Sequence, residues 1–313
     1  MPTIPLLLDG DPGHDDAIAW MLAASSPKLN IRAVTSSAGN QTLEKTTYNA
    51  LRLMALFGIT APMAPGRPRP LLAPPMSAPA VHGASGLDGP ALPEPNQSPS
   101  PLPAADLMAQ AILDSPAPVT IVSTGPLTNT AVLLLSHPEV KERIARISLM
   151  GGGIAHGNWT PAAEFNILVD PEAADLVFRS GLPITMAGLD VTEKALLLPA
   201  DFARIRSVGT PVAAIVADWL DFFYQYHREK GYPGAPIHDG VAVAWLLAPE
   251  LFTAQMMHVD VELEGTYSRG ATVGDPFGIG GKAPNATVLT GVDREKFADL
   301  FVNAVAAYGE GNK

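Results

Sequence analysis

The stretch at residues 6–17, Leu-Leu-Leu-Asp-Gly-Asp-Pro-Gly-His-Asp-Asp-Ala, constrains the fold more than any other part of the chain. A short apolar run that ends at a Pro-Gly break is typical of a buried strand followed by a tight turn. Residues 15–24, which come next, are rich in Ala, Ile, Trp, Met and Leu and indicate a helix. The sequence therefore predicts a buried strand, a turn and a helix at the start of the chain.

Four carboxylates, those of Asp9, Asp11, Asp15 and Asp16, fall within this short stretch. The positive end of a helix dipole favours one or two acidic residues, but four like charges repel one another unless a cation neutralises them. Oxygen ligands in a chain without cysteine suit a hard cation, calcium or magnesium. We therefore expect a metal site at the end of the first strand. The alternative at this point is that Asp15 and Asp16 only cap the helix and that Asp9 is solvated.

Helix geometry separates the roles of the two adjacent aspartates. Neighbouring residues on a helix point about 100° apart, so Asp15 and Asp16 cannot both face one ligand. One can bind a metal while the other reaches a substrate beside it. Asp11, which leaves the strand before Pro12, can approach the metal from another side.

Length and composition limit the classes of protein that the chain can represent. A chain of 313 residues with 47% hydrophobic content can build one large core, and we expect a single domain over residues 1–313. The net charge of −11 argues against nucleic acid and membrane surfaces as partners. The absence of cysteine fits a reducing compartment. No signal segment or apolar run of about 18 residues is evident, so we expect a cytoplasmic protein.

Strand patterns alternate with helix patterns along the chain. Strands are predicted at 31–36, 119–124, 144–150 and 183–187, and helices at 42–57, 105–113, 127–135, 171–178, 211–230, 241–247 and 297–308. This alternation predicts an α/β fold: an open, mostly parallel, doubly wound (Rossmann-like) sheet with helices on both faces. Segments 259–263 and 286–289 are expected as added antiparallel edge strands. Ligands bind outside the carboxyl ends of such strands, where Asp11, Asn40, Thr124 and Met150 fall.

Three further features remain open at this stage. Residues 61–103 hold most of the prolines and form a long irregular connection, which is either functional or disordered. Within it, His82 lies among the glycines of residues 81–89 and is either a surface residue or part of a site. Tyr226 belongs to an aromatic stripe on a long helix, most simply core packing. His238 and Asp239 form a polar pair before a very apolar helix, without an obvious packing role.

Together these motifs resemble the inosine–uridine-preferring nucleoside hydrolase family. The matching segments occur in collinear order over essentially the full length: 9–17, 39–40, 124–129, 150–153, 158, 164–167, 170–174 and 237–239. Residues 158–164 and 234–236 are most similar to the pyrimidine-preferring members.

The resemblance implies calcium-dependent hydrolysis of the N-glycosidic bond of ribonucleosides, through an oxocarbenium-like transition state. It implies calcium as the cofactor, bound by the carboxylates of Asp11, Asp16 and Asp239 and by the carbonyl of Thr124. Asp11 would also take the proton from the calcium-bound water. The partner implied is a small-molecule ribonucleoside, and the assembly a homodimer or homotetramer.

The resemblance also implies which residues hold the substrate. The ribose hydroxyls would be bound by Asp15, Asn40, Asn158, Glu164 and Asn166, and Met150 would lie under the sugar. His238 would help the base to leave, and His82 could join it over the base if residues 81–89 close over the substrate. Tyr226 matches an aromatic position near the base.

The chain departs from the family pattern in two places near the base. Gly240 follows His238-Asp239 where a proline or another small residue is common, and the segment 227–234 is shorter than in similar members. Contacts to the base are therefore the least directly transferred.

Two other functions compete with this hypothesis. Asp9-x-Asp11 is similar to the paired aspartates of haloacid-dehalogenase-type phosphatases, which would make the protein a magnesium-dependent phosphohydrolase. That motif wants Thr or Val where this chain has Pro12-Gly13, and it leaves Glu164-Phe165-Asn166 unexplained. The second alternative is a nucleoside-binding protein that has lost catalysis. Calcium-dependent release of free base would separate the hydrolase from both.

Overall fold

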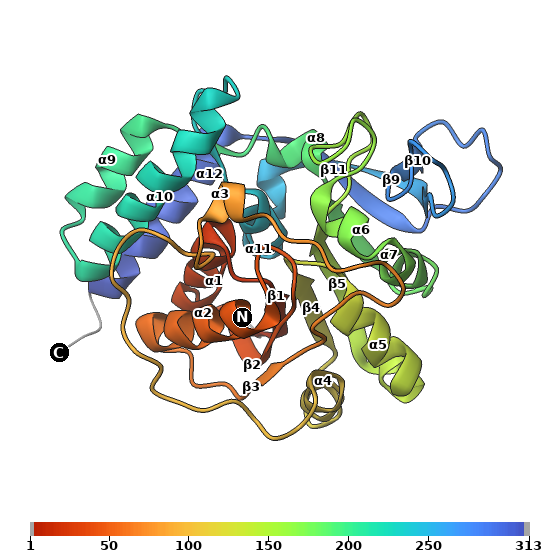
Figure 1. The fold of residues 1–313 in the computed structure, drawn as a ribbon, viewed down its shortest axis with the longest axis horizontal. Helices are drawn as coiled ribbons and strands as arrows, with labels where there is room; N and C mark the ends of the chain where they lie inside the picture. Colours follow the sequence, from red (N-terminus) through yellow and green to blue (C-terminus); the bar gives the residue numbers. More distant parts are fainter. Residues whose placement is uncertain (1–2, 310–313) are drawn as a thin grey trace.

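A single twisted sheet organises the computed structural model, which describes residues 3–309 (Figure 1). Its nine strands lie in the order β10-β9-β11-β6-β5-β4-β1-β2-β3. The bounds are β1 Ile4–Gly10, β2 Leu29–Ser36, β3 Met63–Pro65, β4 Val119–Ser123, β5 Ile144–Met150, β6 Ile184–Ala187, β9 Phe252–Val261, β10 Thr272–Asp275 and β11 Ala286–Val292. Two short strands, β7 Leu196–Leu197 and β8 Ala235–Pro236, pair separately.

Helices cover both faces of the sheet (Figure 1). One face packs mainly against α1 His14–Ser25, α2 Leu43–Phe57, α8 Leu189–Thr192, α9 Pro199–Ser207, α10 Pro211–Glu229, α11 His238–Leu247 and α12 Arg294–Ala306. The other face packs against α4 Ala104–Leu113, α5 Thr128–Ser136, α6 Phe165–Val169 and α7 Pro171–Phe178. The remaining elements are α3 Pro79–His82, η1 Pro138–Arg143, η2 Pro249–Leu251 and η3 Ala307–Gly309.

The apolar run of β1 explains why this strand is central. Leu6 and Leu8 contribute to the core on one face and Leu7 to the core on the other, and all three are buried. Successive side chains of a strand point to opposite faces, so a continuous apolar run is what a strand covered on both sides requires.

The chain reverses direction across the sheet at β1. From β1 the next strands, β2 and β3, lie on one side, whereas β4, β5 and β6 lie on the other. In a parallel sheet this switch point leaves a crevice outside the carboxyl ends of the two central strands. Here those ends belong to β1 and β4, which lead directly to Asp11 and Thr124.

The predicted sheet is confirmed, with corrections at both edges. All neighbouring strands from β3 to β11 are parallel. The prediction that 286–289 is an antiparallel edge strand is wrong, because β11 is parallel to β6 and lies inside the sheet. β9 is antiparallel to β11, as expected, but it is longer than 259–263. Two edge strands were not predicted: β10, whose four residues include Gly274 and no long apolar run, and β3 at the opposite edge, whose three residues lie within the long connection.

The long connection at 61–103 contains only β3 and α3 as regular elements, yet side chains of α2 and its preceding loop hold it in place. Nδ2 of Asn49 donates to the carbonyl of Ser85 at 2.9 Å, and Nε2 of Gln41 donates to the carbonyl of Gly83 at 3.0 Å. Nζ of Lys45 donates to the carbonyl of Ala84 at 2.6 Å. Among the described residues, no helix combines the length and apolar character needed to cross a membrane.

Candidate active site

The turn between β1 and α1 is buried together with its carboxylates. Asp9, Asp11, Asp15 and Asp16 are each at most 6% exposed. Asp16 caps its own helix, because the N–H of Gly13 donates to its Oδ2 at 2.9 Å. The helix-cap alternative is therefore right for Asp16, but it accounts for only part of the cluster.

Asp9 is a structural residue, and the alternative that it is solvated is wrong. Its carboxylate accepts hydrogen bonds from Oγ1 of Thr35 at 2.7 Å, Nδ2 of Asn129 at 2.8 Å and Oγ1 of Thr130 at 3.4 Å. Burial raises the pKa of Asp9 to about 6, although these hydrogen bonds oppose the shift. Asp9 thus ties β1 to β2 and α5 beneath the site.

One carboxylate oxygen of Asp11 accepts a hydrogen bond, and the other is buried without a hydrogen-bond partner in the described chain. The main-chain N–H of Asn40 donates to its Oδ2 at 2.6 Å, whereas its Oδ1 has no partner among residues 3–309. Two glycines approach this carboxylate so closely that no side chain would fit. A Cβ at Gly39 would lie 2.1 Å from Oδ2, and one at Gly125 would lie 2.6 Å from Oδ1.

A second set of carboxylates could hold a cation. One oxygen from each of Asp15, Asp16 and Asp239 lies within 4.8 Å of the others, and all three residues are buried. Burial, and then the charge of Asp16, raises the pKa of Asp15 to about 7, and burial raises the pKa of Asp16 to about 6. Burial and the neighbouring aspartates raise the pKa of Asp239 well above its ordinary value. Without a cation, ionisation of these carboxyl groups is opposed by the negative charge of their neighbours and by the poorly solvating interior.

An all-oxygen donor set of this kind fits a hard cation such as calcium. Oδ1 of Asp15 is a second buried oxygen without a partner in the described chain. The group that the structure brings together contains Asp15 where the sequence prediction has Asp11. The expectation that Asp15 and Asp16 cannot both face one ligand is therefore wrong, because one carboxylate oxygen of each lies within 4.8 Å of the other. The carbonyl of Thr124, also in the predicted ligand set, accepts from Nδ2 of Asn166 at 3.1 Å, while its hydroxyl donates to Oδ1 of Asp16 at 2.6 Å.

The predicted ribose residues do converge. They line a cavity of about 70 Å³ above the carboxylates. Its walls are Asp15, Asn40, Thr124, Met150, Asn158, Glu164, Phe165, Asn166, His238 and Asp239. The carboxyl ends of β1, β4 and β5, and the N-terminal ends of α6 and α11, therefore meet in one polar pocket.

Glu164 and Asn166 are positioned by hydrogen bonds to the backbone. Glu164 accepts from the N–H groups of Asn166, Ile167 and Gly152, and so caps α6. Burial raises the pKa of Glu164. Nδ2 of Asn166 donates to the carbonyl of Met150 at 3.2 Å and lies 3.4 Å from its Sδ. These bonds fix both side chains before any substrate enters.

A larger cavity of about 410 Å³ shares four residues with the small one: Asn40, Asn158, Phe165 and His238. Its other walls are Ala78, Val81, His156, Gly157, Trp159, Glu193, Phe223, Tyr226, His227, Lys230 and Tyr232. Tyr226 lines this cavity, and so does Phe223, which is otherwise buried in the core; the contact of Tyr226 with a base stays a prediction. The mixture of rings and polar groups suits a flat heteroaromatic ligand.

His238 lines both cavities, at the junction between them. Its Nδ1 lies 2.8 Å from Oγ1 of Thr192, which leaves its Nε2 as the nitrogen for other partners. Burial, and then the neighbouring His227, lowers the pKa of His238 to about 3. At neutral pH its imidazole is uncharged and can donate a hydrogen bond from one nitrogen only.

His82 lies behind the cavity wall and lines neither cavity in the described chain, although the adjacent Val81 does. Its ring stacks on Phe223 and on His14, with centroids 5.6 Å apart in both cases. The main-chain N–H of His14 also points to its Nδ1 at 3.3 Å. The predicted approach of His82 to the base would require α3 to move, and it stays a prediction.

Sequence reasoning missed several residues in the wall of the larger cavity or packed behind it. His14, which fills a variable motif position, stacks on Phe222 with centroids 4.9 Å apart, and its Nε2 lies 2.9 Å from the carbonyl of Asp88. His227 could have been found from helical spacing, because it lies four residues after Phe223 and one after Tyr226. No pattern in the sequence indicates Glu193 or Tyr232.

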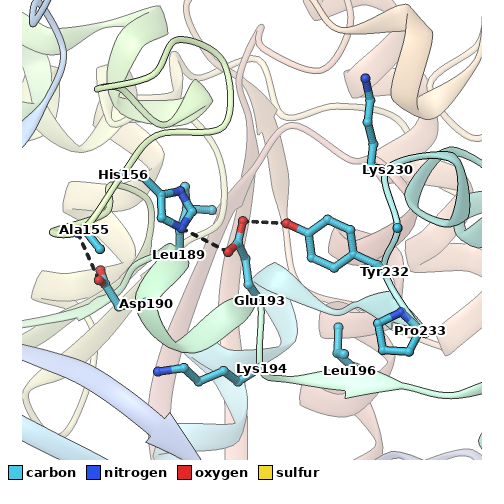
Figure 2. Close-up of a pocket in the computed structure, with 11 residues that line it drawn as sticks. Ala155, His156, Leu189, Asp190, Glu193, Lys194, Leu196, Lys230, Tyr232 and Pro233 are labelled. Atoms are coloured by element: carbon cyan, nitrogen blue, oxygen red, sulfur yellow. Dashed lines mark hydrogen bonds and ion pairs between the residues drawn. The ribbon is translucent and has the colours of Figure 1, made fainter.

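A third cavity, of about 560 Å³, lies beside the larger cavity of about 410 Å³ (Figure 2). Both cavities are lined by His156, Glu193, Lys230 and Tyr232. Glu193 binds on two sides: its Oε2 lies 3.2 Å from Nε2 of His156, and its Oε1 accepts from Oη of Tyr232 at 2.7 Å.

Comparisons with known proteins give one consistent result. The sequence model of a family described as inosine-uridine preferring nucleoside hydrolase matches residues 6–299. Pyrimidine-specific ribonucleoside hydrolase RihA of Escherichia coli K12 is 55% identical over 97% of this chain and 99% of its own. The protein of that name from Citrobacter koseri is 54% identical over the same shares.

Solved structures agree with this result. A purine-preferring ribonucleoside hydrolase from Gardnerella vaginalis superposes with a TM-score of 0.90 at 32% identity, covering 96% of this chain and 98% of its own. The plant nucleoside hydrolase PpNRh1 superposes with a TM-score of 0.91 at 30% identity, covering 98% of this chain and 100% of its own.

Proposed function

The chain belongs to the inosine-uridine preferring nucleoside hydrolase family and is a ribonucleoside hydrolase, and from this premise we propose that it is a calcium-dependent enzyme that cleaves pyrimidine ribonucleosides, uridine and cytidine, to free base and ribose. The preference for pyrimidines is supported by the relatives at 54–55% identity, which are named pyrimidine-specific.

The observation that carries the proposal is the pair of joined cavities. A polar pocket of about 70 Å³ is surrounded by carboxylates and amides, and it shares Asn40, Asn158, Phe165 and His238 with a cavity of about 410 Å³ that contains aromatic side chains. A nucleoside has the same division into a polyhydroxylated sugar and a flat ring. The glycosidic bond would lie near the junction, where His238 is.

Calcium is the proposed cofactor because the buried carboxylates need a cation and offer only oxygen. We assign Asp11, Asp16, Asp239 and the carbonyl of Thr124 as its ligands, and the proximity of Asp15 to Asp16 and Asp239 makes Asp15 a further candidate. When bound, the ion would neutralise the carboxylates and make a nearby water more acidic.

The residues of the chain then have separate tasks. Oδ1 of Asp11 accepts a proton from the attacking water. At the same time the water oxygen bonds to C1′ of the ribose, and the bond from C1′ to the base nitrogen breaks. Asp15, Asn40, Asn158, Glu164 and Asn166 bind the ribose hydroxyls. Met150 lies under the sugar. The negative and dipolar groups around the pocket stabilise the positive charge that develops on the ribose ring, which is stronger in the transition state than in the ground state.

His238 assists the departing base. With Nδ1 accepting from the hydroxyl of Thr192, Nε2 of its uncharged imidazole carries the proton and donates a hydrogen bond to the ring on which negative charge develops, which stabilises the base as it leaves as an anion. Thr192 fixes the ring through Nδ1. Tyr226 and the other side chains of the larger cavity contact the base.

The proposal extends to the setting of the enzyme: a cytoplasmic protein that acts on a small-molecule ribonucleoside as a homodimer or homotetramer, without nucleic-acid or membrane partners. Light scattering on the purified protein distinguishes the two assemblies from a monomer.

A panel of four nucleosides tests the proposed function. Purified protein with calcium is incubated with uridine, cytidine, inosine or adenosine, and free base and ribose are both quantified. We expect the two pyrimidine nucleosides to give the higher kcat/KM values. Faster hydrolysis of inosine would refute the pyrimidine preference, and binding without release of base would favour a silent nucleoside-binding protein.

A further inference from the structure

The short helix α8 bonds to its surroundings through three polar side chains, Asp190 and Thr192 within it and Glu193 just after its end. Asp190 accepts from the N–H groups of Ile154 and Ala155, at 2.7 and 3.1 Å. Thr192 bonds to Nδ1 of His238. Glu193 then binds His156 and Tyr232. This helix therefore connects the loop after β5, the start of α11 and the segment after α10.

Glu193 joins two of these segments across one wall. His156 belongs to the loop between β5 and α6, and Tyr232 belongs to the segment between α10 and β8. In Figure 2 the two side chains point toward the Glu193 carboxylate from opposite sides, and each takes one of its oxygens. The two loops are far apart in the sequence, and the Glu193 carboxylate links them directly.

The position of this link matters because the linked side chains separate two cavities. His156, Glu193 and Tyr232 line both the base cavity of about 410 Å³ and the outer cavity of about 560 Å³. Removal of the carboxylate would free both loops and let the two spaces merge. The side chain of Glu193 is about one-fifth exposed, 21%, so its hydrogen bonds are partly shielded from water and are stronger than those of a fully exposed pair.

We propose that Glu193 is a positioning residue that holds His156 and Tyr232 together as the outer wall of the base cavity and thereby restricts the cavity to single-ring bases. The proposal rests on the function proposed above. It gives Glu193 no contact with the reacting atoms. Its effect is on how tightly and how selectively the base is held.

Kinetics of three variants test this role. We expect Glu193→Ala to raise KM for uridine by roughly 10-fold, the effect of one hydrogen bond to a charged group, with kcat changed less than about 3-fold. The ratio of kcat/KM for uridine to that for inosine should fall by a similar factor. Glu193→Gln, whose amide can still bond to both partners, should recover most of the selectivity. Tyr232→Phe should reproduce part of the loss.

A double variant separates this contact from general damage. If Glu193 acts through Tyr232, Glu193→Ala combined with Tyr232→Phe should be little worse than Glu193→Ala alone. Asp106→Ala serves as the matched control, because it removes another contact between a carboxylate and a histidine, with His137 at 2.8 Å, on α4 on the opposite face of the sheet. It should change neither KM nor selectivity.

Fluorescence provides a readout that does not need turnover. Trp159 lies in the same loop as His156 and is 41% exposed, whereas Trp20 and Trp219 are fully buried. Acrylamide quenching of the Trp159 emission, obtained by subtraction of a Trp159→Phe background, should increase in Glu193→Ala as the loop loosens.

Different results would refute the proposed function and the role of Glu193. If the wild type cleaves uridine while Glu193→Ala keeps the wild-type KM, selectivity and quenching, the role of Glu193 is refuted and the proposed function stands. If the wild type releases base from no nucleoside, the proposed function fails and the selectivity role fails with it. In that case unchanged quenching would also refute the link between the loops.

Discussion

The main-chain N–H of Asn40 donates to Oδ2 of Asp11 over 2.6 Å. The loop that follows β2 thus orients the Asp11 carboxylate, which follows β1. Its Oδ1 lies close to Gly125 at the end of β4 and has no hydrogen-bond partner in the described chain. One side chain is fixed by three strand ends, which is the arrangement that a switch point in a parallel sheet makes possible.

Asp11→Asn tests the role of this oxygen as a base. The amide can keep its oxygen on the Asn40 N–H, but its nitrogen cannot accept a proton. We expect kcat for uridine to fall by about 10²–10⁴-fold, with a smaller loss of calcium affinity measured by titration calorimetry. Asp16→Ala should show the opposite balance, with calcium affinity as its main loss. Near-normal turnover of Asp11→Asn would refute the base assignment.

The polar groups of the small cavity should make the enzyme selective for ribose. A site built to bind a hydroxyl leaves its own groups unpaired when the hydroxyl is missing, and discrimination of about 10⁴-fold is typical. We therefore expect 2′-deoxyuridine to be cleaved far more slowly than uridine, and Asn166→Ala to narrow the difference. Equal rates on the two substrates would show that the ribose contacts are misassigned.

The two histidines should differ in their dependence on the leaving group. Uracil needs help to depart, whereas p-nitrophenolate does not, so His238→Ala should slow uridine cleavage much more than cleavage of p-nitrophenyl riboside. His82→Ala should show the same pattern more weakly, because its ring lies behind Phe223 and must move to reach the base. Unchanged uridine turnover in His82→Ala would exclude His82 from a role in the departure of the base.

Calcium should stabilise the protein more at pH 7.5 than at pH 5. Burial raises the pKa of Asp15 to about 7 and that of Asp16 to about 6, above the value of 3.8 expected when unfolded. Each raised carboxyl group contributes stability below pH 3.8, and this contribution is lost as the pH rises through 6–7. Calcium compensates for that loss, and at pH 5 protons compete with it for the same oxygens.

Thermal unfolding with excess calcium or with a chelator measures this effect. The difference between the two Tm values should be larger at pH 7.5. The pKa values of the buried His14 and His227 are lowered to about 4, so their protonation destabilises the protein as the pH falls. This happens in both samples, and the contribution therefore cancels to first order. A calcium effect that grows toward pH 5 would contradict the assignment of these carboxylates.

Asp9→Ala should destabilise the fold rather than alter the chemistry directly. It would leave the hydroxyl of Thr35 and one N–H of the Asn129 amide, whose Nδ2 also donates to the carbonyl of Ser36, without an acceptor, which costs roughly 1–3 kcal/mol for each unsatisfied group. Urea unfolding should show this loss, and Asp9→Asn, which keeps one acceptor oxygen, should be less destabilised. Wild-type stability of Asp9→Ala would contradict the role of Asp9 as a buried tie between strands.

The sheet could be predicted because its strands are short apolar runs bounded by turn residues, and because each parallel strand is followed by a helix-forming segment. The edge strands β3 and β10 and the position of β11 could not be predicted. Whether a late strand joins a sheet at its edge or within it depends on pairing between distant segments, and local periodicity carries no information on that.

The small cavity could be predicted for a similar reason. Asn40, Thr124 and Met150 lie at strand ends, which a parallel sheet brings together, whereas Asn158, Glu164 and Asn166 are predicted from the resemblance to the family. Most residues of the base cavity come from α3, α10, the segments that follow α8 and α10, and the loop between β5 and α6. The placement of these elements depends on packing between segments that are distant in the sequence. Glu193 is the clearest case, since nothing near it in the sequence shows that His156 and Tyr232 meet at its carboxylate.

Product analysis of uridine cleavage tests the central claim most directly. The protein is incubated with uridine in phosphate-free buffer, with calcium, with a chelator, and with the chelator followed by excess calcium. We predict that uracil and ribose form in equal amounts, that the chelator abolishes both, and that added calcium restores them. Absence of uracil, or its release at an undiminished rate in the chelator, would contradict calcium-dependent hydrolysis of the glycosidic bond.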